Sequence, residues 1–301
     1  MRPREAAFTL HLCVMMLAAT VYVASAAAQT PPVSPTTSPS AVTLDAQLVK
    51  TGLYLIQGGG GNTLLRFTPS GSILVGGKLP GNYRPLMSQV RRISKFGDLP
   101  VRVLVVNDHH EHYTGTNAQF LAAGVPIVAQ EKARQRFGTY TMPEGKTAPP
   151  IVTYDREYTI KMGGIDVRFF NFGSAHTDGD TVAYFTNLKV VAVGDLYTRG
   201  TPDPDFAAGG SLVGWSPVLA EVLKIDFDTA VPGTGPAVSK ADVIAFKSKL
   251  DTLLARGTAL VAKGVPKDRL MAELRTDDLG WRFDFTPEQL DRFYAELSQA
   301  K

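Results

Sequence analysis

The sequence predicts an α/β protein in which residues 45–301 fold as a single domain of two β-layers covered by helices. Two observations support this prediction. Short apolar strands alternate with helical segments at both ends of this region, and no linker-like stretch interrupts them after residue 45. The chain has 301 residues, of which 44% are hydrophobic, so it is long enough to bury a large core.

The first half of the region is expected to contain strands joined by tight turns, followed by strands that alternate with helices. The glycines at 58–61 lie between two apolar runs, and no Gly-Lys-Ser/Thr follows them, so they indicate a hairpin turn rather than a phosphate-binding loop. Apolar periodicity predicts strands at 53–57, 63–67, 72–75, 101–106 and 125–129, and helices at 84–96, 116–123 and 131–137.

The second half is expected to form a strand meander that leads into a helical end. The predicted strands are 157–162, 166–171, 181–186, 190–193 and 229–231, and a helix is predicted at 213–224. Two pairs in the last quarter are typical of helix N-termini, Ser239 with Asp242 and Thr286 with Gln289.

The N-terminus has the composition of an export signal. Arg2 and Arg4 precede an apolar stretch from Ala6 to about Val23, and three alanines follow at 26–28. We therefore expect residues 1–28 to be a cleaved signal peptide and 29–44, rich in Pro, Ser and Thr, to be a disordered linker. This predicts a periplasmic or secreted protein without stable membrane insertion after cleavage.

Charge and cysteine content exclude several functions. The formal net charge is +3, of which the leader contributes one unit, and there is no basic cluster, so a nucleic-acid partner is not expected. The one cysteine is Cys13, in the leader. A mature protein would therefore have no disulfide, no cysteine redox chemistry and no thiolate zinc ligand, and any metal site must use His, Asp or Glu.

The histidines are concentrated in two loops that follow strands. Three of the five lie within 109–112, directly after the predicted buried strand, and His176 lies in the polar loop 173–180. Asp195 follows the strand that ends at Gly194. Imidazoles and carboxylates held at strand ends are suitable ligands for a shared metal ion.

Four segments together resemble the metallo-β-lactamase superfamily, in particular its exported single-domain branch. They occur in the family's order over roughly residues 45–250: Asp108–Asn117, Ala175–Asp180, Gly194–Leu196 and Pro232–Pro236. The resemblance implies an αβ/βα four-layer sandwich with a metal site on one edge. The residues beyond it would form a helical C-terminal extension.

The resemblance also indicates which ligands are retained. Of the family's seven usual ligands, three are intact: His110, His176 and Asp195. The other four positions hold Asp108, His112, Tyr113 and Thr234. In the family two zinc ions hold a bridging hydroxide, and the second ion depends on three of the four substituted positions. We therefore expect that second position to be empty or weak here.

The first metal position keeps two imidazoles and gains a carboxylate. A mononuclear site of Asp108, His110 and His176, helped by Asp195 or His112, is chemically reasonable because two histidines and one carboxylate form a known mononuclear arrangement with open coordination sites. Zinc is the expected metal, with iron or manganese as alternatives. Asp108, His112 and Tyr113 are the candidate catalytic residues.

Two functions remain open. The first is an exported metal-dependent hydrolase that acts on a small-molecule lactam, ester or thioester through a metal-activated water. The second is a catalytically inactive binding protein with a decayed metal site. In either case His109 is expected to face away from the site, Glu111 is expected to face solvent, and Tyr83, Tyr140 and Trp215 are candidates for the pocket walls.

Overall fold

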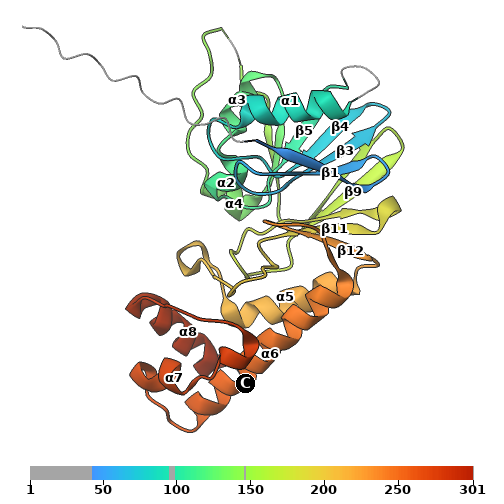
Figure 1. Ribbon diagram of the computed structural model, residues 1–301. Helices are drawn as coiled ribbons and strands as arrows, with labels where there is room; N and C mark the ends of the chain where they lie inside the picture. The colour runs from blue at the N-terminus through green and yellow to red at the C-terminus, as the bar shows by residue number, and fades with distance from the viewer. Residues whose placement is uncertain (1–42, 95–98, 146, 301) are drawn as a thin grey trace, which may run out of the picture. The chain divides into compact units, whose positions relative to one another are not determined.

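A computed structural model describes residues 43–94, 99–145 and 147–300 of the chain. Within the compact unit Ala41–Lys301, two β-sheets lie face to face and helices cover both outer faces (Figure 1). This is the predicted four-layer α/β architecture. The predicted signal peptide and residues 29–42 of the predicted linker lie outside the described residues. Leu44, at the end of that linker, is buried, and its carbonyl accepts a hydrogen bond from Gln89 Nε2 at 2.7 Å.

The first sheet has seven strands in the order β1 to β7. They span Asp45–Lys50, Leu53–Gln57, Thr63–Thr68, Gly71–Val75, Val101–Val105, Ile127–Gln130 and Ile151–Tyr154. β1 to β4 form an antiparallel meander, and the pairs from β4 to β7 are parallel. The helices within this half are α1 Tyr83–Ile93, α2 Glu111–Thr114, α3 Asn117–Ala122 and α4 Glu131–Gln135.

The second sheet has six strands in the order β13-β12-β11-β10-β9-β8. They are β8 Glu157–Met162, β9 Ile165–Phe170, β10 Val182–Phe185, β11 Val190–Gly194, β12 Thr229–Pro232 and β13 Val238–Ser239. Only β11 and β12 pair in parallel, and α5 connects them. The helices of this half are α5 Leu212–Lys224, α6 Lys240–Ala262, α7 Lys267–Glu273 and α8 Pro287–Gln299.

Alternating side chains of the strands build three separate cores. In β11, Val190 and Ala192 join the core between the sheets, whereas Val191 and Val193 face the layer of α5 to α8. In β4, Ile73 faces the second sheet and Leu74 faces α1 and α3. This period of two is the pattern that places apolar side chains on both faces of a buried strand. The strands that lead to their polar ends are therefore anchored by apolar side chains on both faces.

The predicted elements are largely confirmed, and the exceptions have physical reasons. Both predicted helix starts form capping boxes, Ser239 with Asp242 and Thr286 with Gln289. β1 was not predicted because it is an edge strand in which polar and apolar residues are equally frequent and half of the residues are exposed. Leu48, for example, is 61% exposed. Within the residues described, none of the helices is both long and apolar enough to span a bilayer.

Candidate metal centre

The turn after β5 positions the first two candidate ligands. Asp108 follows this strand, and its Oδ1 accepts a hydrogen bond from the backbone N–H of His110 at 2.7 Å. Such a local side-chain-to-backbone bond favours a turn over continuation of the strand. His110 then stands as the N-cap of α2 with extended backbone angles. The side chains of Asp108 and His110 are consequently held side by side, with Oδ1 and Nδ1 3.1 Å apart.

The loop after β9 positions His176. Asp180, which is buried, accepts hydrogen bonds from the backbone N–H of Thr177 at 2.9 Å and from its hydroxyl at 2.6 Å. The ring of His176 is oriented by the loop that contains Asp203, because its Nδ1 lies 2.7 Å from the carbonyl oxygen of that residue. This contact leaves Nε2 as the ring nitrogen available to a ligand.

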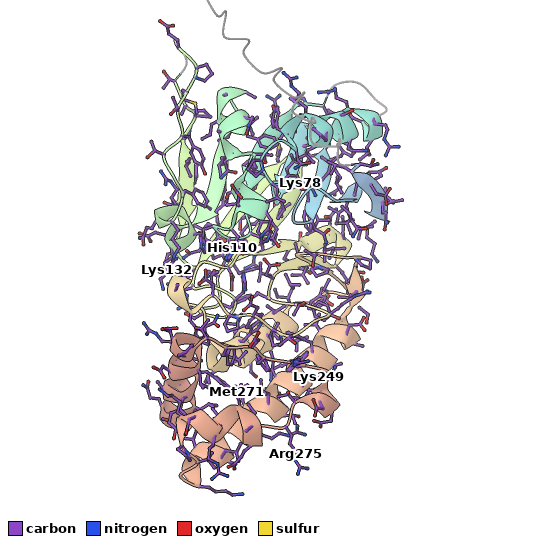
Figure 2. The ribbon with its side chains drawn as sticks, turned by 60° about the vertical axis from the view of Figure 1, so that its left-hand side comes forward. Lys78, His110, Lys132, Lys249, Met271 and Arg275 are labelled. Carbon is purple, nitrogen blue, oxygen red and sulfur yellow. The ribbon has the colours of Figure 1, made fainter. Side chains whose placement is uncertain are left out.

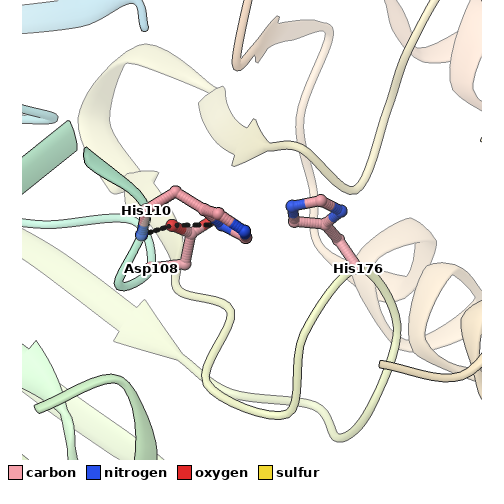
Figure 3. Close-up of side chains that lie close together, drawn as sticks. All are labelled: Asp108, His110 and His176. Carbon is pink, nitrogen blue, oxygen red and sulfur yellow. Dashed lines mark hydrogen bonds and ion pairs between the residues drawn. The ribbon is translucent and has the colours of Figure 1, made fainter. Parts of the chain in front are cut away.

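Asp108, His110 and His176 converge on one point. Their potential ligand atoms all lie within 4.8 Å of one another, and the two imidazole rings have centroids 4.8 Å apart. Figure 3 shows the two rings pointing toward each other from separate loops, with the carboxylate of Asp108 beneath His110. Asp108 is 1% exposed, whereas the side chains of His110 and His176 remain 28% and 14% exposed. The side-chain cluster is thus anchored in the interior and reachable from solvent.

Asp195 belongs to a neighbouring group and not to that triad. Asp108, His112 and Asp195 form a second set of potential ligand atoms within 4.8 Å of one another. His112 Nε2 lies 3.0 Å from Asp195 Oδ2, and the Tyr113 hydroxyl donates to Asp195 Oδ1 at 3.3 Å. Asp195 Oδ2 is 3.8 Å from His176 Nε2. The four predicted metal ligands are therefore close together but divide between two overlapping groups.

The loop after β12 fits tightly against this second group. A Cβ on Gly233 would lie 1.9 Å from Asp195 Oδ1 and 2.3 Å from the Tyr113 hydroxyl. Only glycine allows the backbone to approach so closely. Thr234, at the position of the family's final histidine, is exposed. Tyr113 is fully buried, with its hydroxyl on Asp195. The catalytic roles predicted for Asp108, His112 and Tyr113 remain predictions.

His109 does not face away from the site as expected. Its ring lies 4.3 Å from that of His110, and its Nε2 is 3.7 Å from Asp205 Oδ2. His109, His110 and Asp205 form a third set of potential ligands within 4.8 Å of one another. Asp205 is absent from the sequence-based prediction because the loop that carries it has no recognisable motif. Glu111 is exposed, as predicted.

The expected wall residues lie in two different places. Trp215 is adjacent to the site, with its ring centroid 6.2 Å from that of His176. Tyr83 and Tyr140 instead pack into the core between the helices and the first sheet. The prediction that these two tyrosines line the pocket is thus wrong, because both help to cover an apolar sheet face.

Carboxylates dominate the electrostatics of the cluster. The hydrogen bond with Asp108, together with the nearby Asp205 and Asp195, raises the pKa of His110 to about 9 although burial opposes this. Burial alone would raise the pKa of Asp108, but its contacts with His110 and His176 bring the net pKa below the usual value. For His176, the surrounding carboxylates outweigh burial and raise the pKa. The cluster is an environment that stabilises positive charge.

A buried lysine linked to α2 was also not predicted from the sequence. Lys78 is 0% exposed, and its Nζ donates hydrogen bonds to the carbonyl oxygens of Ile56 at 2.8 Å and Gly61 at 2.6 Å. The backbone N–H of Gly61 in turn donates to the carbonyl of His112 at 3.0 Å. Figure 2 shows Lys78 in the half of the first sheet and His110 where the two halves meet. Lys78 therefore fixes the glycine-rich turn that supports α2.

The donor set fits a divalent transition metal. The triad offers two imidazole nitrogens and one carboxylate, which are the nitrogen and oxygen ligands that zinc, iron and manganese accept. The second ring nitrogen of His176 is engaged by a backbone carbonyl, as is typical of metal-ligating histidines. The donor types and the fixed orientation of His176 therefore fit a divalent cation.

Comparison with known proteins identifies the fold. No family model matches the chain, and no curated protein matches it by sequence. Among solved structures, a metallo-β-lactamase from Pontibacter korlensis is 18% identical with a TM-score of 0.56, covering 69% of this chain and 99% of its own. The metallo-β-lactamase FIM-1 from Pseudomonas aeruginosa, in its mono-zinc form, is 18% identical with a TM-score of 0.57, covering 71% of this chain and 97% of its own.

A third structure agrees with these two. The DIM-1 metallo-β-lactamase is 19% identical with a TM-score of 0.57, covering 70% of this chain and 99% of its own. The chain thus has the metallo-β-lactamase fold, as the motif resemblance implied. At this level of identity the likeness shows the fold, and chemistry has to be argued from the site itself.

Proposed function

We propose that the protein is an exported metal-dependent hydrolase with one catalytic cation at Asp108, His110 and His176. The observation that carries this proposal is the convergence of these three side chains, from two loops far apart in the sequence, within 4.8 Å of one another. Two imidazoles and a buried carboxylate brought together from separate loops are typical of a metal or catalytic site.

The residues around the cation position have distinct roles in the proposed reaction. When bound, a divalent cation supplies Lewis-acid activation of water and of the bond to be broken. Asp195 orients the imidazole of His112, which accepts and returns a proton, and the hydroxyl of Tyr113 holds Asp195 in place. Partial exposure of the histidines admits a small substrate, and we propose a lactam, an ester or a thioester.

Zinc is the metal we propose first, with iron and manganese as alternatives. The ligands are nitrogen and oxygen only, and a protein of the same fold is known in a mono-zinc form. The proposed location is the periplasm or the exterior of the cell, on the basis of the N-terminal sequence. No nucleic-acid partner is proposed, because the chain is nearly neutral.

The experiment is metal loading followed by activity on a substrate panel. Chelator-treated protein is reloaded with Zn²⁺, Fe²⁺ or Mn²⁺, the bound metal is counted by mass spectrometry, and hydrolysis of a chromogenic cephalosporin, a nitrophenyl ester and a thioester is measured. We expect one tightly bound cation and hydrolysis of at least one substrate, both lost in His110→Ala and His176→Ala. Asp166→Asn, at an exposed carboxylate in the second sheet, is the control. A metal-free protein that hydrolyses nothing would refute the proposal.

One observation favours a second candidate, a binding protein without catalysis. The side chains of the cluster already pair with one another, since the carboxylate of Asp108 contacts the ring of His110 and the carboxylate of Asp195 contacts the ring of His112. Such internal pairing satisfies the side chains without a cation. In that case a ligand would raise the melting temperature equally with and without chelator.

A further inference from the structure

Asp205 presents one carboxylate oxygen to two imidazoles. Its Oδ1 accepts a hydrogen bond from the backbone N–H of Ala208 at 3.0 Å, which leaves Oδ2 free. Oδ2 lies 3.4 Å from His110 Nε2 and 3.7 Å from His109 Nε2. Asp205 is held in this position by its backbone, because its N–H donates to the carbonyl of His176 at 2.8 Å.

The spacing of these atoms suits a cation better than a hydrogen bond. N–H···O hydrogen bonds in proteins have donor–acceptor distances of about 2.7–3.2 Å, and both contacts of Oδ2 are longer. Two ligand atoms about 2.1 Å from a tetrahedral ion lie about 3.4 Å apart. The distance between His110 Nε2 and Asp205 Oδ2 has this value.

The imidazole of His110 can serve two positions at once only as an imidazolate, which forms when the two cations displace the ring N–H protons to solvent. Its Nδ1 lies 3.1 Å from Asp108 Oδ1, on the side of the central triad, and its Nε2 faces Asp205. His109 contributes only through Nε2, because its Nδ1 is buried and has no hydrogen-bond partner among the described residues. The side chains of His109, His110 and Asp205 are 18%, 28% and 28% exposed, so a cation from solvent reaches them.

We propose that His109, His110 and Asp205 form an outer cation site, separate from the central triad and linked to it through His110. It takes a divalent transition metal such as zinc, since its donors are two imidazoles and one carboxylate. The outer cation binds more weakly than the central one, because it is more exposed and because two like charges on one imidazole repel each other. The site does not depend on the hydrolytic reaction.

The test is a titration of chelator-treated full-length protein with Zn²⁺ in a calorimeter, repeated with Co²⁺ and followed by visible absorption. We expect two binding events in the wild type, the second at least about ten-fold weaker than the first. Asp205→Asn and His109→Ala should each remove the second event and keep the first. His176→Ala should remove the first event and keep the second, and His110→Ala should remove the first event and weaken the second.

A matched control lies two residues away. Asp203→Asn changes an exposed carboxylate in the same loop but keeps the backbone carbonyl that contacts His176, so both events should remain. Asp205→Asn retains an oxygen that can accept from Ala208, so its fold, checked by circular dichroism, should be unchanged.

Three results would overturn the outer site. The first is a single binding event in the wild type, and the second is a second binding event that survives both Asp205→Asn and His109→Ala. The third is a second binding event that is removed by His112→Ala alone. That result would assign the weaker cation to the group of Asp108, His112 and Asp195. Two binding events in a protein that hydrolyses none of the substrates would refute the proposed function and leave the outer site intact.

Discussion

His112 Nε2 lies 3.0 Å from Asp195 Oδ2, although the two residues are 83 positions apart in the chain. The contact joins the first helix after β5 to the end of β11, so it crosses from one sheet to the other. Because of this contact, Asp195 has two candidate roles. The carboxylate either orients His112 or ligates the central cation itself.

Asp195→Asn distinguishes these roles. We expect the variant to bind the central cation as the wild type does, because Asp195 is outside the central triad, and to lose hydrolysis by about 10–100-fold. The measurement is the metal content and kcat/KM of the same preparation. Asp226→Asn, at an exposed carboxylate paired with Lys189, should change neither value. Loss of the cation in Asp195→Asn would make Asp195 a ligand, as the sequence alone suggested.

Gly233→Ala should disturb the same contact through packing. The added methyl group would overlap Asp195 Oδ1 and the Tyr113 hydroxyl, so both side chains must move. We expect a loss of about 1–3 kcal/mol in the free energy of unfolding, and reduced hydrolysis. Urea denaturation measures the first effect. At Gly200 a Cβ would meet only Thr198 Oγ1, at 3.7 Å, so Gly200→Ala should be nearly neutral. Equal effects of the two substitutions would contradict the packing argument.

The fold could be predicted from the sequence because its strands carry their signal locally. Val103 and Val105 lie in a short apolar run that reads as a buried strand whatever surrounds it, and both join the core between the sheets. Asp108, His110 and His176 were found because they lie in short motifs at strand ends. For the strand and for the candidate ligands alike, a few adjacent residues were sufficient for the prediction.

The missed parts of the site depend on contacts between distant segments. Asp205 reaches His109 only because the loop that carries Asp205 is bonded to the loop of His176. The backbone N–H of Asp205 donates a hydrogen bond to the carbonyl oxygen of His176. Lys78 looks like an ordinary surface lysine in the sequence, and only the folded chain shows that it is buried, with its amine bonded to the carbonyl oxygens of Ile56 and Gly61. Contacts between distant segments leave no pattern in the local sequence, so the positions of Asp205 and Lys78 could not be predicted from their neighbours in the chain.

Phe285→Ala tests whether the C-terminal segment supports the site. The ring of Phe285 packs edge-on against Phe206, at 6.1 Å between centroids, and Phe206 directly follows Asp205. We expect the outer cation to bind several-fold more weakly and the free energy of unfolding to fall by about 1–3 kcal/mol. Calorimetric titration with Zn²⁺ gives the affinity. Phe67→Ala, which removes a similar edge contact with Tyr54 in the first sheet, should lower stability without changing cation affinity. A similar loss of affinity in both variants would argue against specific support.

Lys78 makes the stability of the protein depend on pH. Burial lowers the pKa of its amine from 10.5 to about 7. Above this pH the folded protein has lost a proton that the unfolded chain keeps up to its own pKa. The unfolded state thus binds more protons between these two values, and the contribution of Lys78 to the free energy of unfolding rises with pH by up to about 1.4 kcal/mol per unit.

Lys78→Met should remove this contribution while keeping most of the buried volume. Since every other group titrates in both proteins, the difference in free energy of unfolding between wild type and variant isolates Lys78. We expect this difference to shift in favour of the wild type steadily from pH 7 to pH 10, as measured by urea denaturation of chelator-treated protein. Lys161→Met, at a lysine whose side chain is 75% exposed, should differ from the wild type by a constant amount over the same range. A constant difference for Lys78→Met as well would mean that the buried amine stays protonated, held by the carbonyl oxygens of Ile56 and Gly61.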